Sequence, residues 1–230
     1  MAVNSMYESL LTLPLFKGLS YTRLSEIVGN TRLAFLKDLP GETILTAGEP
    51  CSQIKFVIMG DVRLTISNST DRFRVSQTLR APALISPDFL FGRHTMYPGT
   101  ARAIDTVSIM QIDKADLIRL LQSDEIFIFN YLNMLSTNAQ KAIDGIIALT
   151  SGSLEERIAY WIIALTQLGS DDIVLSARQR DLYTLFNVQR SSFIATLDSL
   201  KERGIIDYGT NEIRVLSRRA LRSVLLKTPD

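Results

Sequence analysis

Four consecutive polar residues, Gln189-Arg190-Ser191-Ser192, open a segment whose apolar residues follow helical spacing. Gln and Arg can each form two hydrogen bonds with the edge of a base, while Ser and a helix N-terminus suit phosphate oxygens. Two arginines precede this run and a lysine follows it. The sequence therefore predicts a DNA-binding site made of Arg178, Arg180, Gln189, Arg190, Ser191, Ser192 and Lys201.

The charge distribution fits phosphate binding by the C-terminal part of the chain. The 230 residues carry a net charge of +1, but Ser176–Asp230 contains ten Lys or Arg and six Asp or Glu, a net charge of +4. The preceding residues are therefore net negative, at −3. A positive segment on an otherwise acidic chain suits a module that binds a phosphate backbone. The same charged residues, taken singly, also fit a solvated surface.

The chain has few residues that are arranged for catalysis or for binding a metal ion. His94 is the single histidine, and the sequence has neither a Gly-rich phosphate loop after a strand nor a metal-ligand cluster. Glu155 and Glu156 are adjacent on a predicted helix, so their side chains point about 100° apart and cannot act on one substrate bond. The single cysteine, Cys51, excludes an intramolecular disulfide and a cysteine-ligated iron–sulfur cluster. We expect no enzyme activity, no catalytic residue and no metal site.

Two helices and a turn are needed to position the predicted DNA-binding residues. Ser176-Ala-Arg-Gln179 matches a capping box, which predicts a helix from there to Phe186. Asn187 can form a tight turn because Asn tolerates the left-handed conformation. A second helix is predicted over Gln189–Arg203, with Gly204 ending it. Two such helices joined by a short turn form a helix-turn-helix.

A β-hairpin is predicted to follow the second helix. Ile205–Tyr208 and Glu212–Val215 have strand composition and are separated by the turn residues Gly209-Thr210-Asn211. The C-terminal part therefore has the pattern of a winged helix-turn-helix, whose second helix exposes polar residues at its N-terminal end and buries its opposite face.

The N-terminal half has a different texture. From about Leu33 to Ile112, short runs of β-branched and aromatic residues alternate with turn residues, which is typical of an antiparallel sandwich or barrel. Lys55–Ile58 and Arg63–Ile66 alternate polar with apolar residues, so each predicts a strand with one face inward. Short helices are expected before this domain, where Leu11 to Ile27 show an interrupted helical scatter.

A long helix is predicted between the two halves. Its apolar and small residues repeat at spacings of four and three, which is a heptad seam, and Gly145 within it permits close packing. A second copy of the chain is the simplest cover for this seam, although the seam can also pack on its own domain. The predicted dimerisation residues are Ile128, Leu132, Leu135, Ala139, Ala142, Ile146 and Leu149.

The domain boundaries follow from these segments. The helical pattern is interrupted at Thr150-Ser151-Gly152. A capping box, Ser153 with Glu156, follows and starts a helix running to about Leu168. We expect a sensor-like β domain over 1–123, a dimerisation helix over 124–150 and a DNA-binding domain over 151–230. No apolar run is long enough to span a membrane and the N-terminus lacks a basic signal region, which favours the cytoplasm.

Taken in order, these motifs resemble the CRP/FNR superfamily of bacterial regulators over roughly residues 10–226. Each motif is weakly specific alone, but their order and spacing make the resemblance strong. It implies an α+β protein with an antiparallel β-roll or jelly-roll sensor domain, a long dimerisation helix and a winged helix-turn-helix that reads a palindromic site. The matching segments are Pro14–Leu19, Gly41–Ile44, Gly48-Glu49, Ile54–Val62, Arg180–Leu182, Val188–Ser192 and Leu200–Ile206.

The resemblance also suggests where an effector would bind and argues against cyclic AMP. Nucleotide-binding members hold the ribose with a Gly-Glu pair and the cyclic phosphate with an Arg followed by a small polar residue. Here the pair is Gly92-Arg93, and Arg102 does not fall at the phosphate position. Ala142-Ile143 stands on the long helix where such members often have Thr-Ser. The candidate effector-binding residues are Gly92, Arg93, His94, Thr100, Ala101 and Arg102.

The sequence also limits the other cofactors of the family, because an iron–sulfur cluster and a haem each need particular ligand residues. The iron–sulfur branch needs several cysteines, which Cys51 alone cannot supply. Haem remains open, with His94 or a methionine as ligand, although a lone His in a Pro/Gly-rich loop is more often a surface residue. Many members carry Glu where Ser191 stands and a second Arg where Ala195 stands, so the base sequence that they read does not transfer.

We therefore expect a homodimeric, sequence-specific DNA-binding transcription regulator controlled by an unidentified small effector. Its partners would be a second copy, a palindromic duplex and, as a further candidate, RNA polymerase, with no membrane. The alternative is an effector-binding regulatory or sensor protein that has lost DNA binding, against which the basic N-terminal end of the second helix argues.

Overall fold

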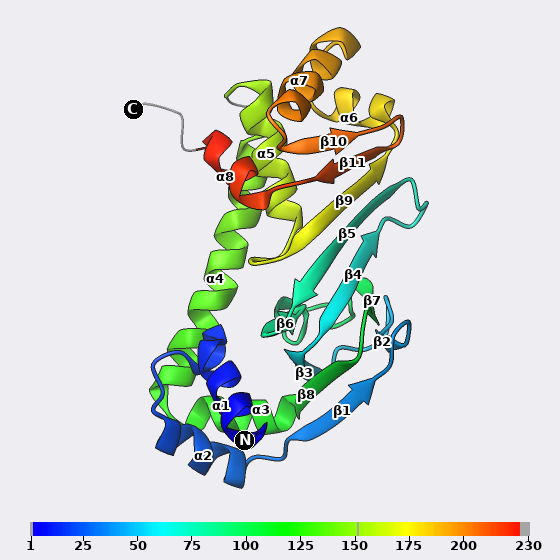
Figure 1. Ribbon diagram of the computed structural model, residues 1–230. Coiled ribbons are helices and arrows are strands. Elements are labelled where there is room, and N and C mark those ends of the chain that lie inside the picture. The colour runs from blue at the N-terminus through cyan, green and yellow to red at the C-terminus, as the bar shows by residue number, and fades with distance from the viewer. Residues whose placement is uncertain (1, 151, 226–230) are drawn as a thin grey trace. The chain divides into compact units, whose positions relative to one another are not determined.

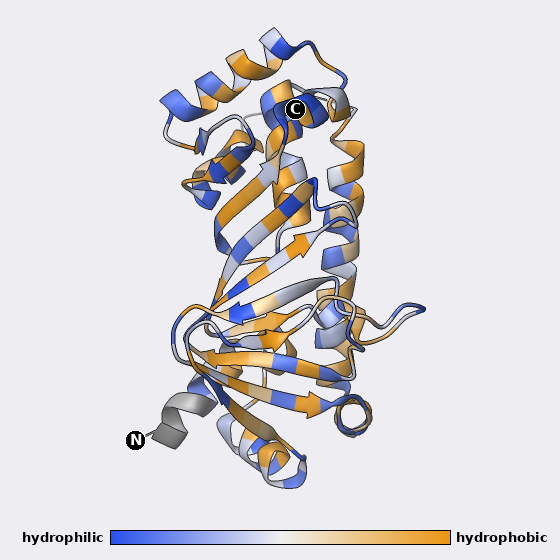
Figure 2. Cartoon of the chain, turned by 90° about the vertical axis from the view of Figure 1, so that its right-hand side faces the viewer, coloured by the Kyte–Doolittle hydropathy of each residue, from blue (hydrophilic) through white to orange (hydrophobic). Residues whose placement is uncertain are grey.

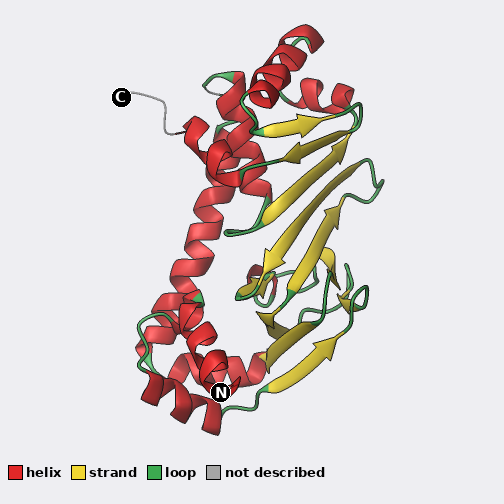
Figure 3. Cartoon of the chain, in the orientation of Figure 1, coloured by secondary structure: helices red, strands yellow, loops and turns green. Residues whose placement is uncertain are grey.

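The computed structural model describes residues 2–150 and 152–225 of the chain (Figure 1). The backbone forms two compact units. Unit 1 lies within residues 1–64 and 79–138, and unit 2 within residues 65–78 and 139–230. Both units combine helices with antiparallel strands (Figure 3), as the predicted α+β class requires. Of the predicted break at 150–152, Ser151 lies outside the described residues.

Unit 1 begins with the short helices that the sequence predicts. The Ser20 hydroxyl caps one of them by accepting a hydrogen bond from the Arg23 amide at 3.2 Å. None of the described helices is both long and apolar enough to cross a membrane. The helices of this part are α1 (Ala2–Thr12), η1 (Pro14–Phe16), α2 (Tyr21–Asn30), η2 (Pro87–Phe89) and α3 (Lys114–Ser123).

The strands of unit 1 form one sheet in the order β1-β8-β3-β6 and a second group in the order β4-β7-β2. The strand pairs of the first sheet are all antiparallel, as is the pair of β2 with β7. The first eight strands of the chain, of which β5 lies mostly in unit 2, are β1 (Ala34–Asp38), β2 (Thr43–Leu45), β3 (Gln53–Met59), β4 (Asp61–Ser67), β5 (Phe73–Arg80), β6 (Ala83–Ile85), β7 (Gly99–Ala103) and β8 (Val107–Asp113).

The predicted one-sided burial holds for β4 and is wrong for β3. In β4, Val62 and Leu64 are buried between less buried neighbours. In β3, Lys55 is also buried, so this strand has buried residues on both of its faces. The Lys55 ammonium donates to Gln111 Oε1 at 2.5 Å and to Gln53 Oε1 at 3.3 Å, which satisfies it there.

The core of unit 1 joins its helices to its sheets through aromatic side chains. Phe16 of η1 lies 5.5 Å from Phe56 of β3 and 6.1 Å from Phe127, measured between ring centroids. All three rings are buried. In Figure 2, hydrophobic and hydrophilic residues alternate along several strands, which is the pattern of strands with one buried face.

The predicted long helix is α4 (Glu125–Ile147), so Leu149 of the expected seam lies just beyond its end. Gly145 of α4 packs closely against a neighbouring helix, as predicted: a Cβ at this position would lie 2.2 Å from the Cβ of Ala164. Close approach of the two backbones therefore requires glycine here.

Unit 2 contains the predicted helix-turn-helix and hairpin. Helix α5 has the predicted capping box, with Ser153 and Glu156 bonded reciprocally, but it ends at Leu165 instead of near Leu168. The elements are α5 (Leu154–Leu165), β9 (Asp171–Ala177), α6 (Gln179–Leu185), α7 (Arg190–Glu202), β10 (Ile206–Tyr208), β11 (Glu212–Val215) and α8 (Arg218–Leu225).

The second predicted capping box is wrong. Ser176 lies in strand β9, and α6 starts later, with Arg178 as an N-cap that makes no side-chain cap bond. Ser176 is extended because its strand is paired on both sides, with Glu212 of β11 and with Arg74 of β5. The strands of unit 2 therefore run in the order β10-β11-β9-β5, and β5 enters through residues 65–78.

The core of unit 2 gathers α5, α6, α7, β9 and the hairpin around one apolar cluster that includes Val75 of β5. The ring of Trp161 lies 5.4 Å from that of Phe73 and 5.5 Å from that of Phe186. Phe186 in turn stacks on Phe193 of α7 at 6.2 Å. Residues on β5 thus belong to the core that holds the helix-turn-helix.

Candidate DNA interface

Helix α7 is fixed by one face and open at its N-terminal end. Phe193, Leu197 and Leu200 are buried in the core of unit 2. Gln189 is the N-cap, and the side chains of Gln189-Arg190-Ser191-Ser192 are exposed. Within residues 2–150 and 152–225, these four side chains make no hydrogen bond or ion pair with the rest of the chain. They are free to bond an external partner.

The turn between α6 and α7 is held in place by backbone geometry and by α5. Asn187 adopts φ 51°, the left-handed conformation that the sequence predicts for it. The Val188 amide donates to the Tyr183 carbonyl at 3.0 Å, and the Arg157 guanidinium donates to the Phe186 carbonyl. These bonds fix the angle at which α7 leaves the turn.

The side chain of Glu155 on α5 anchors α7 at its C-terminal half. The Ser199 hydroxyl donates to Glu155 Oε1 at 2.8 Å, and Arg203 forms an ion pair with the same carboxylate. Helix α7 therefore has rigid support behind its exposed N-terminal residues, which a binding helix requires.

Arg178 and Arg180 lie at the start of α6, near the wing. Arg178 forms a two-point ion pair with Asp181, with Nε–Oδ2 at 2.9 Å and Nη2–Oδ1 at 3.0 Å. This hydrogen bonding lowers the pKa of Asp181 and raises that of Arg178. The Gln179 side-chain amide donates to the Gly209 carbonyl at 3.1 Å, which joins the start of α6 to the turn between β10 and β11.

Lys201 does not lie with the other predicted DNA-binding residues. It is in the last turn of α7, about 16 Å along the helix from Arg190 at 1.5 Å per residue. Its ammonium pairs with Asp207 Oδ1 at 2.7 Å and lies 5.6 Å from the Tyr208 ring centroid. The structure thus brings six of the seven residues to the α6–α7 region and leaves Lys201 at the opposite end of α7.

A hollow of about 270 Å³ in unit 2 adjoins Arg178. Of its lining residues, only Arg178 was predicted from the sequence to bind DNA. Arg72 has no local signal because it is distant in sequence from the helix-turn-helix, and only the β5–β9 pairing brings it there. The lining residues are Asp71, Arg72, Ser176, Ala177, Arg178 and Asn211.

The six predicted effector-binding residues fall on two segments of unit 1. Gly92, with φ 103°, and the exposed Arg93 and His94 lie in the loop after η2. Thr100, the buried Ala101 and Arg102 lie on β7. The Thr100 hydroxyl accepts from the Ala47 amide at 3.2 Å, and Arg102 Nη1 donates to the Gly41 carbonyl at 3.4 Å. These two polar side chains are thus engaged by backbone groups.

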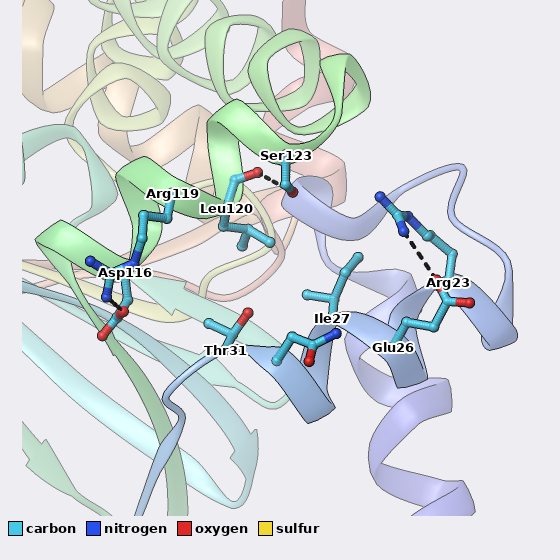
Figure 4. Close-up of a pocket in the computed structure, with 9 residues that line it drawn as sticks. Arg23, Glu26, Ile27, Thr31, Asp116, Arg119, Leu120 and Ser123 are labelled. Carbon is cyan, nitrogen blue, oxygen red and sulfur yellow. Dashed lines mark hydrogen bonds and ion pairs between the residues drawn. The ribbon is translucent and has the colours of Figure 1, made fainter.

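A hollow of about 290 Å³ in unit 1 contains none of these six residues. It lies between α2 and α3, where Figure 4 shows Arg23 beside Glu26 on one helix and Arg119 beside Asp116 on the other. Both arginines are ion-paired within their own helix. Arg23 also lies 3.5 Å from Asp124.

Cys51 and His94 are the residues that a redox or haem function would use. Cys51 is buried, and burial raises the pKa of its thiol. Among the described residues, no group of three His, Cys, Asp or Glu is arranged to hold a metal ion.

The predicted dimerisation seam is largely exposed in the single chain. Leu132 of α4 is 53% exposed and Ile146 is 68% exposed. Ile128, Ala139 and Ala142 are also exposed, whereas Leu135 and Leu149 are partly buried. Large apolar side chains in contact with water along one helix indicate a surface that a partner covers.

Comparison with known proteins assigns both parts of the chain. The cyclic nucleotide-binding domain family matches residues 39–124, and the Crp-like helix-turn-helix domain family matches residues 156–224. No curated protein matches the chain at a significant level.

Several solved structures match the chain at low identity. The Catabolite Activator Protein of Thermus thermophilus is 18% identical, with 93% of this chain and 99% of that chain covered and a TM-score of 0.49. A CooA mutant of Carboxydothermus hydrogenoformans is 14% identical, with 92% and 94% covered and a TM-score of 0.49. The sensor domain of the regulator DNR from Pseudomonas aeruginosa is 21% identical, with 57% and 91% covered and a TM-score of 0.45.

Proposed function

Because the chain belongs to the CRP/FNR family of DNA-binding transcription regulators, we propose that its helix α7 enters the major groove and reads bases with Gln189 and Arg190. The observation that carries this proposal is the unengaged polar end of a helix whose opposite face is buried. Ser191 and Ser192 suit the adjacent phosphates, as do Arg178 and Arg180 at the start of α6. Lys201, at the far end of α7, has a minor part at most.

The proposal is tested by selecting duplexes from a random library with the wild-type protein and then titrating the selected duplex. Arg190→Ala removes two hydrogen bonds to a base, so its affinity for the selected site falls by about 1–3 kcal/mol, or roughly 5- to 150-fold. Binding to a scrambled duplex falls much less. Arg32→Ala, which removes an exposed arginine of unit 1, is the matched control and keeps wild-type affinity.

An unchanged affinity of Arg190→Ala for the selected site contradicts the assignment of α7 as the reading helix. No binding to any duplex at low salt instead favours the alternative, a sensor that has lost DNA binding.

We further propose that two copies pair along the exposed seam of α4 and read a palindrome. Each copy then presents one α7 to successive turns of the major groove, about 34 Å apart. We expect such a protein to act in the cytoplasm, where it can reach a chromosome, with RNA polymerase as a candidate partner. We assign it no catalytic role.

For the effector, the polar groups favour a molecule other than cyclic AMP. Arg93 stands where a ribose-binding carboxylate would be needed, and Thr100 and Arg102 already bond backbone groups. The buried Cys51 is a single thiol, which argues against an iron–sulfur cluster. Native mass spectrometry of protein purified without added ligand identifies a retained effector by its mass, haem included. A mass shift equal to cyclic AMP contradicts the proposal.

A further inference from the structure

The hollow beside Arg178 joins two segments that are distant in the sequence. β5 pairs with β9 in antiparallel register, Phe73 opposite Ala177 and Arg74 opposite Ser176. The next residue outward on each segment is an arginine, Arg72 on one and Arg178 on the other. Both side chains are exposed and line the hollow.

Positive charge exceeds negative charge at this place. Asp181 is the carboxylate that Arg72, Arg178 and Arg180 share, and all three arginines lower its pKa, Arg178 most strongly by hydrogen bonding. Asp71, which also lines the hollow, is paired with Arg74. Like charges that face each other across paired strands are destabilising, and an anion between them relieves the repulsion.

The position of the hollow relative to the helix-turn-helix indicates which anion. The first helix of such a motif crosses the DNA backbone while the second lies in the groove. Arg178 stands at the start of that first helix, and Gln179 ties it to the wing turn at Gly209. Asn211 of the same turn lines the hollow and adds neutral hydrogen-bonding groups.

We propose that the turn between β4 and β5 extends the DNA interface, with Arg72 and Arg178 together binding a backbone phosphate that flanks the site read by α7. A residue from the N-terminal half of the sequence would then contribute directly to DNA affinity. This inference rests on the proposed DNA-binding function and deepens it. A phosphate contact carries no base information, so it strengthens binding to all sequences.

The test is the salt dependence of DNA binding by the full-length chain. For duplex DNA, the slope of log K against log salt concentration falls by about 0.9 for each phosphate that the protein no longer neutralises. The proposed dimer loses one such contact in each copy, so Arg72→Gln is expected to reduce the slope by about 1.8, twice this amount, on both the selected and the scrambled duplex. Arg72→Lys keeps the positive charge and is expected to retain the wild-type slope.

Arg32→Gln, the same change at an exposed site in unit 1, is the matched control and leaves the slope unchanged. A wild-type slope for Arg72→Gln overturns the inference, as does an equal decrease in Arg72→Lys or in Arg32→Gln. The proposed function is judged separately: Arg190→Ala loses affinity for the selected duplex whether or not Arg72 binds a phosphate.

Discussion

At the scale of single residues, two arginines of unit 2 differ in whether an intramolecular ion pair fixes the side chain. Arg178 is held in a two-point ion pair by Asp181, whereas Arg190 has no intramolecular partner among the described residues. A guanidinium that is already oriented suits a phosphate at a fixed position. A free guanidinium can adjust to the edge of a base. We therefore expect the same residue type to position the protein at one site and to read sequence at the other.

A second residue-scale feature, the close approach at Gly145, gives a prediction on stability. Alanine is favoured over glycine in a helix by about 1 kcal/mol, but the added methyl would lie 2.2 Å from Ala164 Cβ. Overpacking costs about 1–3 kcal/mol, so we expect Gly145→Ala to lower the free energy of unfolding despite its better helix propensity. Urea denaturation followed by circular dichroism measures the change.

Gly29 of α2 is the matched control for this experiment. A Cβ there meets nothing within 4 Å, so Gly29→Ala should be neutral or stabilising. If both substitutions stabilise the protein, the packing at Gly145 is looser than the structure indicates.

The positions of the candidate site residues in the fold were predictable where their signal is local. Asn187 was predicted to turn from its own chemistry, and Gln189–Ser192 from their place at a helix start. The place of Arg72 beside Arg178 was not predictable, because it depends on strand pairing with a segment far along the chain. Lys201 was predicted with the site from its charge, but the helix carries it to the opposite end.

At the scale of elements, β9 shows how a local signal can mislead. Ser176 followed by Gln179 has the spacing of a capping box, yet Ile173, Leu175 and Ala177 are buried at alternate positions of a strand. The alternation was the stronger signal, because pairing with β5 and β11 satisfies more backbone groups than one cap. The helix-turn-helix itself was predicted because its helices carry their own apolar periodicity.

The pairing of β5 with β9 predicts a spectroscopic effect. Trp161 is the single tryptophan of the chain, and its ring lies 5.4 Å from that of Phe73 on β5. Phe73→Ala removes this neighbour, so we expect the tryptophan emission to shift to longer wavelength and unit 2 to unfold at lower denaturant concentration. The destabilisation should be below the roughly 3–5 kcal/mol of a fully buried Phe, because Phe73 is partly exposed.

Phe129→Ala is the control for that experiment, because Phe129 is 62% exposed on the unit 1 part of α4. It should leave the emission unchanged. An unchanged emission in Phe73→Ala would mean that β5 does not cover Trp161 in solution.

At the scale of the whole molecule, the exposed face of α4 requires a partner to explain it. Packing within a single chain would bury a heptad seam, but Leu132 and Ile146 remain in water here. From the sequence alone, the seam could be covered either by its own domain or by a second copy. The exposure favours the second copy, since the described residues leave Leu132 and Ile146 largely uncovered.

We therefore expect the wild-type protein to sediment with twice the 25.7 kDa mass of the chain. Leu132→Glu places a charge in the seam and should yield a folded monomer, because the side chain is exposed in each copy. That monomer should bind a single half-site only weakly. Asn133→Glu, the neighbouring exposed position about 100° away around the helix, should remain dimeric. A wild-type monomer at micromolar concentration contradicts the proposed pairing.

Residues 65–78 complete the sheet of a unit whose remaining residues all follow position 138. Genetic recombination exchanges contiguous stretches of a gene, so a crossover within α4 would give the new DNA-binding half a hairpin that evolved with a different β9. Such a chimaera would inherit an imperfect strand pairing and a mismatched Trp161 environment. We expect engineered or natural hybrids of this protein to need both segments from the same parent, which makes its two halves less interchangeable than their order along the gene suggests.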